Sequence, residues 1–226
     1  NMSHEIRTPM NSIIGFSELL EDPSISYEER MEYIDIIKKN SDKLLHFIEN
    51  LLDVSVIEAG QIKISKSYCY VNQIFDELFS SFNIIKSKLE KNHIEFRLKK
   101  DIQDANFYFV TDLYRFQQIL MNLLNNAFKF TNEGFVELGY NIIDEGATIK
   151  FYIKDSGVGI PSDKVDSIFE TFAQVKYNGI DNFSGVGLGL AIARQLSEIL
   201  GGKMSVETEV CKGTTFYLTM PLMYQL

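Results

Sequence analysis

The chain has 226 residues, of which 45% are hydrophobic and 23% charged, a balance typical of a globular protein with a substantial core. Its net charge of −9 argues against nonspecific binding to nucleic acid or to anionic membranes as its main task. Cys69 and Cys211 do not suggest a disulfide framework and favour a reducing compartment. No apolar run approaches the ~20 residues that span a bilayer. Because the chain begins at Asn1, inside an expected helix, we interpret it as part of a longer protein.

Two long helices are expected first. Apolar residues at helical spacing predict a helix over 1–21, and Ser26 followed by two glutamates predicts the start of a second helix over 27–57. Gly60 is expected to end it. Such a hairpin cannot bury both faces alone, so we expect it to dimerise into a four-helix bundle. Packing of the hairpin onto the rest of the same chain is the alternative.

The remaining sequence predicts a mixed helix and strand unit, with the boundary near residues 58–68. Helices are expected over 72–91, 112–130 and 188–200. Alternating or β-branched runs predict strands in "HIEFRLKK", "NFYFVT", "FVELGYNII", "ATIKFYIKD", "KMSVETE" and "TTFYLTMPL". The fold class expected for the chain is therefore α+β.

The segment "DSGVGIP" follows one of the predicted strands. Gly157 and Gly159 permit close backbone approach or a positive φ, and Asp155 ahead of them could accept a hydrogen bond from a ligand amine. A simple turn from strand to loop explains the same pattern. A third glycine and a βαβ unit are missing, so this is not the dinucleotide-binding fingerprint.

A glycine run, "SGVGLGLAIA", precedes the last predicted helix. Gly185, Gly187 and Gly189 alternate there, and successive backbone N–H groups at a helix N-terminus form an anion site suited to phosphates. A flexible hinge is the other interpretation.

The predicted helix over 112–130 carries a polar stripe. Asn122, Asn126 and Lys129 fall at i, i+4 and i+7 on one side of it. An amide oxygen is a hard ligand that could complete a Mg²⁺ shell shared with nucleotide phosphates, and a lysine could neutralise phosphate charge. A solvated polar face explains the stripe equally well.

The motifs "SHEIRTPM", "NLLNNAFKFT", "DSGVGI", "IFETFAQV", "GVGLGLAIA" and "KGTTF" occur in this order along the chain. In this order the sequence resembles the sensor histidine kinases of two-component signalling, over essentially its whole length. The resemblance implies a dimerisation and histidine phosphotransfer hairpin at residues 1–60, lacking its N-terminal part. It also implies a two-layer α/β sandwich at 61–226 that binds ATP, of the kind shared with gyrase, Hsp90 and MutL.

The resemblance also implies roles for individual residues. His4 resembles the phosphorylated histidine, Glu5 the adjacent acceptor of its ring proton, and Thr8 a residue one turn on that could orient water for a phosphatase reaction. Thr8 could instead bond a backbone carbonyl beside Pro9, which interrupts the hydrogen bonding of a helix. Asn126 matches the Mg²⁺ ligand. The residues that match the nucleotide site are Asn122, Lys129, Phe130, Asp155, Gly157, Gly159, Phe169, Phe172, Gly185, Gly187, Gly189 and Thr214.

The chain departs from the family in the stretch before the glycine run. Many relatives have a basic residue and two adjacent glycines there, whereas this chain has "IDNFSGVG", and Lys176 is the nearest substitute cation. The other histidines, His46 and His93, lack a comparable setting and are interpreted as solvated.

The implied activity is autophosphorylation of a histidine by ATP with Mg²⁺, then transfer to an aspartate of a response-regulator receiver domain, separate or in the same parent chain. Phosphatase activity on that regulator is a further possibility. The chain is expected to form a homodimer in the bacterial cytoplasm and to bind no nucleic acid. It is expected to be the cytoplasmic part of a larger sensor, with or without a membrane anchor. An ATP-driven clamp and a catalytically weak dimeric scaffold are the alternative functions.

Overall fold

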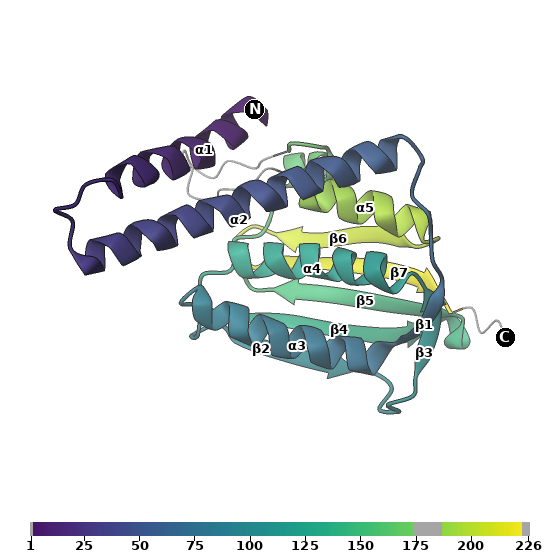
Figure 1. The fold of residues 1–226 in the computed structure, drawn as a ribbon. Coiled ribbons are helices and arrows are strands. Elements are labelled where there is room, and N and C mark those ends of the chain that lie inside the picture. Colours follow the sequence, from purple (N-terminus) through teal and green to yellow (C-terminus); the bar gives the residue numbers. More distant parts are fainter. Residues whose placement is uncertain (1, 174–186, 223–226) are drawn as a thin grey trace. The chain divides into compact units, whose positions relative to one another are not determined.

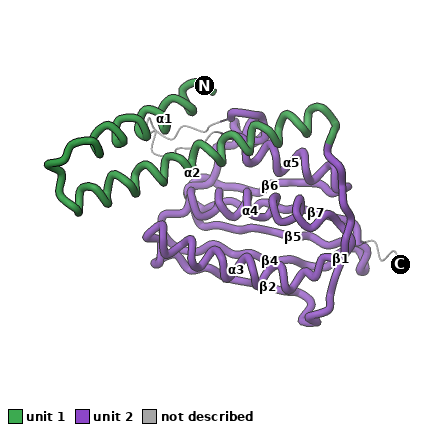
Figure 2. The backbone as a smooth tube through the Cα atoms, viewed as in Figure 1, with its two compact units in different colours: residues 1–61 green, residues 62–226 purple. Residues whose placement is uncertain are grey.

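The computed structural model describes residues 2–173 and 187–222, which form two compact units. The first unit comprises residues 1–61 and the second residues 62–226, coloured separately in Figure 2. Within the described ranges, every helix is too short or too polar to cross a bilayer.

The first unit is a helical hairpin. Helix α1 runs over Met2–Leu19 and α2 over Tyr27–Glu58, close to the expected ranges, and Phe16 packs on Tyr33 between them. Ser26 and Glu29 form a reciprocal capping box at the start of α2. Gly60, with a φ of +63°, closes its end, and a backbone bond from Gln61 to Val56 completes a Schellman motif.

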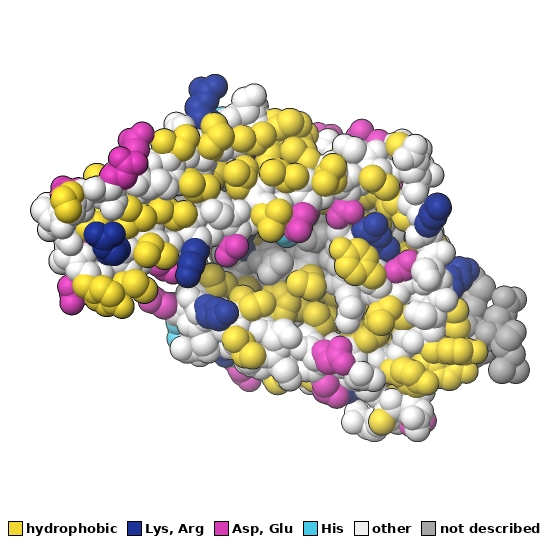
Figure 3. Space-filling model, in the orientation of Figure 1, with side chains coloured by type: hydrophobic (Ala, Val, Ile, Leu, Met, Phe, Trp, Pro, Cys, Tyr) yellow, Lys and Arg dark blue, Asp and Glu magenta, His cyan; other side chains and the backbone are white. Residues whose placement is uncertain are grey.

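Large apolar side chains remain exposed on this hairpin, and Figure 3 shows hydrophobic side chains along its surface. The exposed ones include Met10, Ile14, Leu45, Ile48 and Leu52. An apolar surface of this kind is typical of a helical pair that associates with another protein surface.

The second unit is a sheet covered by helices. Five strands lie in the order β2 (Glu95–Lys100), β4 (Phe135–Ile143), β5 (Thr148–Asp155), β7 (Gly213–Pro221) and β6 (Lys203–Glu209). Only the β2–β4 pair of this sheet is parallel. Helices α3 (Val71–Lys88), α4 (Leu113–Phe130) and α5 (Gly189–Ile199) lie on one face of it (Figure 1). A separate two-stranded ribbon pairs β1 (Ser67–Tyr70) with β3 (Tyr108–Thr111).

Aromatic side chains fill the space between the helices and the sheet. Phe116 of α4 lies 4.8 Å from Phe151 of β5, and Phe75 of α3 lies 5.4 Å from Tyr140 of β4, between ring centroids. Tyr140 Oη is 2.9 Å from Asn72 Oδ1, so the buried hydroxyl has a partner. The contact between Phe116 and Phe151 fixes α4 against β5, and these two elements carry Asn122, Asn126, Lys129, Phe130 and Asp155 of the predicted nucleotide and metal site.

Helix α3 differs from its prediction. It ends at Lys88 instead of Lys91, because Glu90 has a φ of +57° and its N–H bonds back to Ser87 O. Lys91 therefore lies in the turn between α3 and β2.

Candidate nucleotide and phosphotransfer sites

The predicted phosphotransfer residues lie on one turn of α1. His4 and Thr8 are exposed and Glu5 is half-buried. The Thr8 hydroxyl donates to the His4 carbonyl at 3.1 Å, as in the backbone interpretation of Thr8. The helix continues through Pro9, whose missing N–H leaves the Glu5 carbonyl without its helical donor. An exposed imidazole on this turn is accessible to an electrophile.

Asp155, at the end of β5, is only 5% exposed. Its Oδ1 accepts hydrogen bonds from Gly157 N at 2.9 Å and Thr214 N at 3.2 Å. Burial raises the pKa of the carboxyl to about 6, although these two hydrogen bonds act to lower it. Among the described residues, no donor contacts Oδ2, which leaves that oxygen able to accept from a ligand.

The loop after Asp155 has no room for side chains at its glycines. A Cβ on Gly157 would overlap the Phe130 carbonyl, and one on Gly159, where φ is +71°, would overlap the Glu209 carbonyl. Val158 N donates to Phe130 O at 3.3 Å, so the loop is joined to the end of α4. The glycines therefore allow the close packing that presents Asp155.

The polar stripe of α4 leads toward α5. Asn122 Nδ2 is buried and has no hydrogen-bond partner within the described part of the chain. A Cβ placed on Gly189, the first residue of α5, would lie 3.5 Å from Asn122 Oδ1. Asn126, one turn further along α4, is half-buried, and Lys129 Nζ lies 4.6 Å from the centroid of the Phe130 ring. An orphaned buried amide next to a helix N-terminus is suited to a polar ligand.

Two segments close to α5 are joined by backbone contacts. Phe172 N donates to Gly187 O at 2.9 Å, and both residues have positive φ, +65° and +74°. A Cβ on Gly187 would overlap the Ala173 carbonyl, which explains the need for glycine. Phe169 meets Phe216 edge to face, and Arg194 lies 5.2 Å above the Phe169 ring.

Some predicted residues lie outside the described residues. These are Gly185 and the altered stretch before it, including Lys176, Asp181, Asn182 and Ser184. Within the described ranges, no group of three His, Cys, Asp or Glu side chains could hold a metal ion.

Sequence reasoning missed Thr208 of β6. Its hydroxyl accepts from Ile160 N at 2.8 Å and lies 3.0 Å from Thr214 Oγ1, so it joins the Asp155 loop to β6 and β7. Thr208 occurs in an ordinary alternating strand, and no local signal distinguishes it.

The fold and these sites together define a nucleotide-binding α/β sandwich preceded by a helical hairpin with an exposed histidine. The "Histidine kinase-, DNA gyrase B-, and HSP90-like ATPase" family matches residues 111–223, half of the chain. The "His Kinase A (phospho-acceptor) domain" matches residues 1–60. The chain belongs to the sensor histidine kinases of two-component systems.

Two curated relatives illustrate this membership. The autoinducer 2 sensor kinase/phosphatase LuxQ of Vibrio vulnificus is 35% identical over 98% of this chain and 26% of LuxQ. The aerobic respiration control sensor protein ArcB of Escherichia coli is 34% identical over 97% of this chain and 28% of ArcB. The chain thus spans about a quarter of the length of these relatives.

Solved structures show the same fold. Full-length ShkA in complex with AMPPNP matches 97% of this chain and 44% of the ShkA chain, with a TM-score of 0.72 and 30% identity. The Acinetobacter baumannii histidine kinase AdeS matches 97% of this chain and 98% of its own, with a TM-score of 0.72 and 18% identity.

Proposed function

We propose that this chain uses ATP to phosphorylate His4 and then transfers the phosphoryl group to an aspartate of a response-regulator receiver domain. One combination of features carries the proposal: an exposed histidine in the phospho-acceptor hairpin, and a buried carboxylate, beside glycine-lined backbone, with one oxygen that accepts no hydrogen bond from the described residues. An ATP-driven clamp does not require the exposed histidine, and a catalytically weak scaffold does not require the buried carboxylate.

His4 is the proposed nucleophile. One ring nitrogen attacks the γ-phosphorus, a P–N bond forms, and the bond to the departing ADP oxygen breaks. Glu5, the next residue, would accept a hydrogen bond from the N–H of the other ring nitrogen and so offset the developing imidazolium charge. Exposure of His4 supports this role, since no packed side chain needs to move before attack.

The nucleotide is proposed to bind between α4, the Asp155 loop and the start of α5. Asp155 Oδ2 would accept from the adenine amine, with Phe130 beside the base, and Lys129 would face phosphate oxygens. A Mg²⁺ ion, held by Asn126 and phosphate oxygens, would neutralise phosphate charge. The other proposed contacts come from Asn122, Gly157, Gly159, Phe169, Phe172, Gly185, Gly187, Gly189 and Thr214.

Homodimerisation through the hairpin is part of the proposal. The exposed apolar side chains of α1 and α2 supply the surface, and burying them against a second hairpin would stabilise both copies. Sedimentation over a range of concentrations should show a dimer that weakens on dilution.

A phosphatase activity toward the regulator is also proposed, because the curated name of LuxQ includes phosphatase. Thr8 is the residue that would orient water, with its hydroxyl released from the His4 carbonyl.

The test is incubation with γ-labelled ATP. Label that is lost in acid and retained in alkali identifies a phosphohistidine. His4→Gln should abolish this label and leave ATP affinity within a few-fold. His46→Gln is the control, since His46 is an exposed histidine of α2 whose Nδ1 is 3.9 Å from Glu49. Label that persists on His4→Gln would disprove the assignment, and ATP hydrolysis without label would favour the clamp.

A further inference from the structure

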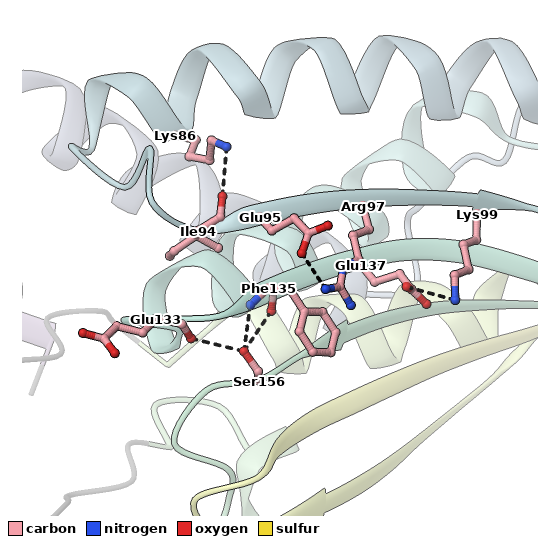
Figure 4. A network of polar contacts seen from close by, with 9 residues as sticks. All are labelled: Lys86, Ile94, Glu95, Arg97, Lys99, Glu133, Phe135, Glu137 and Ser156. Atoms are coloured by element: carbon pink, nitrogen blue, oxygen red, sulfur yellow. Dashed lines mark hydrogen bonds and ion pairs between the residues drawn. The ribbon is translucent and has the colours of Figure 1, made fainter.

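The connection between α4 and β4 contacts the Asp155 loop through its backbone carbonyls. Phe130 O accepts from Val158 N, and Phe135 O accepts from Ser156 N at 3.1 Å. Ser156 Oγ lies 3.2 Å from Glu133 O and accepts from Phe135 N at 2.8 Å (Figure 4). These hydrogen bonds hold the Asp155 loop against the connection between α4 and β4.

The same connection is held from its other side by the turn between α3 and β2. Lys91 Nζ donates to Phe128 O, to Lys129 O at 3.3 Å and to Thr131 O at 2.8 Å. These carbonyls belong to the end of α4, where helical acceptors lack helical donors. Lys91 of the turn between α3 and β2 thus binds the carbonyls of residues 128, 129 and 131, and the Asp155 loop contacts those of residues 130, 133 and 135.

The chemistry of Lys91 matches this position. An ammonium group has three donors, and three carbonyls converge on it. Its positive charge lies at the negative end of the α4 dipole. Lys91 is not ion-paired to any carboxylate of the described chain, and partial burial lowers the pKa of its ammonium. The side chain is therefore directed at the helix end alone.

The turn that carries Lys91 is itself fixed. Lys91 N bonds to Lys86 O and Ile94 N bonds to Lys91 O, each at 3.0 Å. Lys86 Nζ donates to Ile94 O at 2.9 Å, as Figure 4 shows. His93 Nε2 adds a contact of 2.7 Å to Asn132 O. A rigid turn lets Lys91 determine where the end of α4 lies.

The geometry points to Lys91 as a positioning residue of the nucleotide site: it holds the last turn of α4 so that Phe130 O anchors the Asp155 loop. The inference rests on the proposed function, since the loop matters only if it binds a nucleotide. Without the ammonium, the carbonyls of the last turn lose three donors, and that turn carries Lys129 and Phe130 as well as the anchor.

The experiment compares Lys91→Met with Lys88→Met in the whole chain. Both changes remove an ammonium, but Lys88 is an exposed residue of the last turn of α3 and its side chain forms no hydrogen bond or ion pair with another described residue. In Lys91→Met we expect amide exchange at Val158 and Gly157 to quicken about tenfold, because their support is lost. Amides of the sheet centre, such as Leu138 and Ile153, should keep their rates. ATP affinity should fall by about tenfold as well. Lys88→Met should leave all of these values near wild type.

Two results would overturn the inference. One is unchanged exchange at Val158 and unchanged ATP affinity in Lys91→Met. The other is equally faster exchange throughout the sheet, which would mean that Lys91 only stabilises the fold. If Lys91→Met does not fold, Lys91→Gln decides, since its amide keeps two donors and should give an intermediate effect; wild-type values in that variant would also overturn the inference. Exchange needs no nucleotide, so a wild-type chain that fails to bind ATP would defeat the proposed function separately.

Discussion

Asp155→Asn should separate the stability of this chain from its affinity for ATP. The folded carboxyl has a pKa of about 6 because it is buried, against an ordinary value of 3.8. At 1.36 kcal/mol for each pKa unit, this difference corresponds to a cost of about 3 kcal/mol for ionising the folded protein above pH 6. The asparagine removes that cost, and its Oδ1 can still accept from Gly157 N and Thr214 N.

The sign of the pH dependence follows from the two pKa values. Below pH 3.8 the carboxyl is neutral in both the folded and the unfolded chain. Between 3.8 and about 6 the unfolded chain ionises first, so the wild-type free energy of unfolding falls as pH rises, and above 6 the loss is complete. The stability advantage of Asp155→Asn should therefore grow by up to about 3 kcal/mol between pH 4 and pH 8.

Urea unfolding followed by near-ultraviolet circular dichroism gives this difference, since buried Tyr140 reports on the sandwich. Asp163→Asn is the control, because it also removes one carboxylate, but an exposed one outside the hydrogen bonds of Asp155. ATP affinity of Asp155→Asn should fall at least tenfold, since an amide N–H would face the adenine amine. Wild-type affinity should also fall as pH drops through about 6, because a neutral carboxyl is a weaker acceptor. A stability difference that does not change with pH would refute the reasoning.

The remaining predictions concern three other positions. Asn126→Ala removes the proposed Mg²⁺ ligand and Asn126→Asp adds negative charge beside the phosphates, so both should lower label incorporation by orders of magnitude. Near-normal rates in both variants would show that Asn126 is not the metal ligand. Thr8→Ala should spare autophosphorylation and reduce phosphatase activity, which is measured as loss of label from a purified phospho-regulator. Equal losses in the two assays would mean that Thr8 has only a structural role, through its bond to the His4 carbonyl. Gly187→Ala should cost about 1–3 kcal/mol of stability, because φ is +74° there and a Cβ would overlap the Ala173 carbonyl. Thermal unfolding measures that cost, and an unchanged Tm would mean that the backbone relaxes freely.

The sequence by itself determined most elements of both units. Helix α2 starts at a capping box whose two members are three residues apart, and its end is set by one glycine. The strands of the main sheet follow from alternation within each run. These signals are local, so neighbouring residues suffice to read them. The family was also readable, since its motifs lie in order along the chain and the comparisons confirm it.

Only the tertiary structure decided how these pieces meet. Lys91 was expected within a helix, yet it lies in a turn and binds carbonyls 37 to 40 residues away. Thr208 contacts Ile160 N across 48 residues. The pKa of Asp155 depends on burial by packed elements, which no motif encodes. Strand register and helix packing fix such contacts, and both depend on the shapes of side chains distant in sequence.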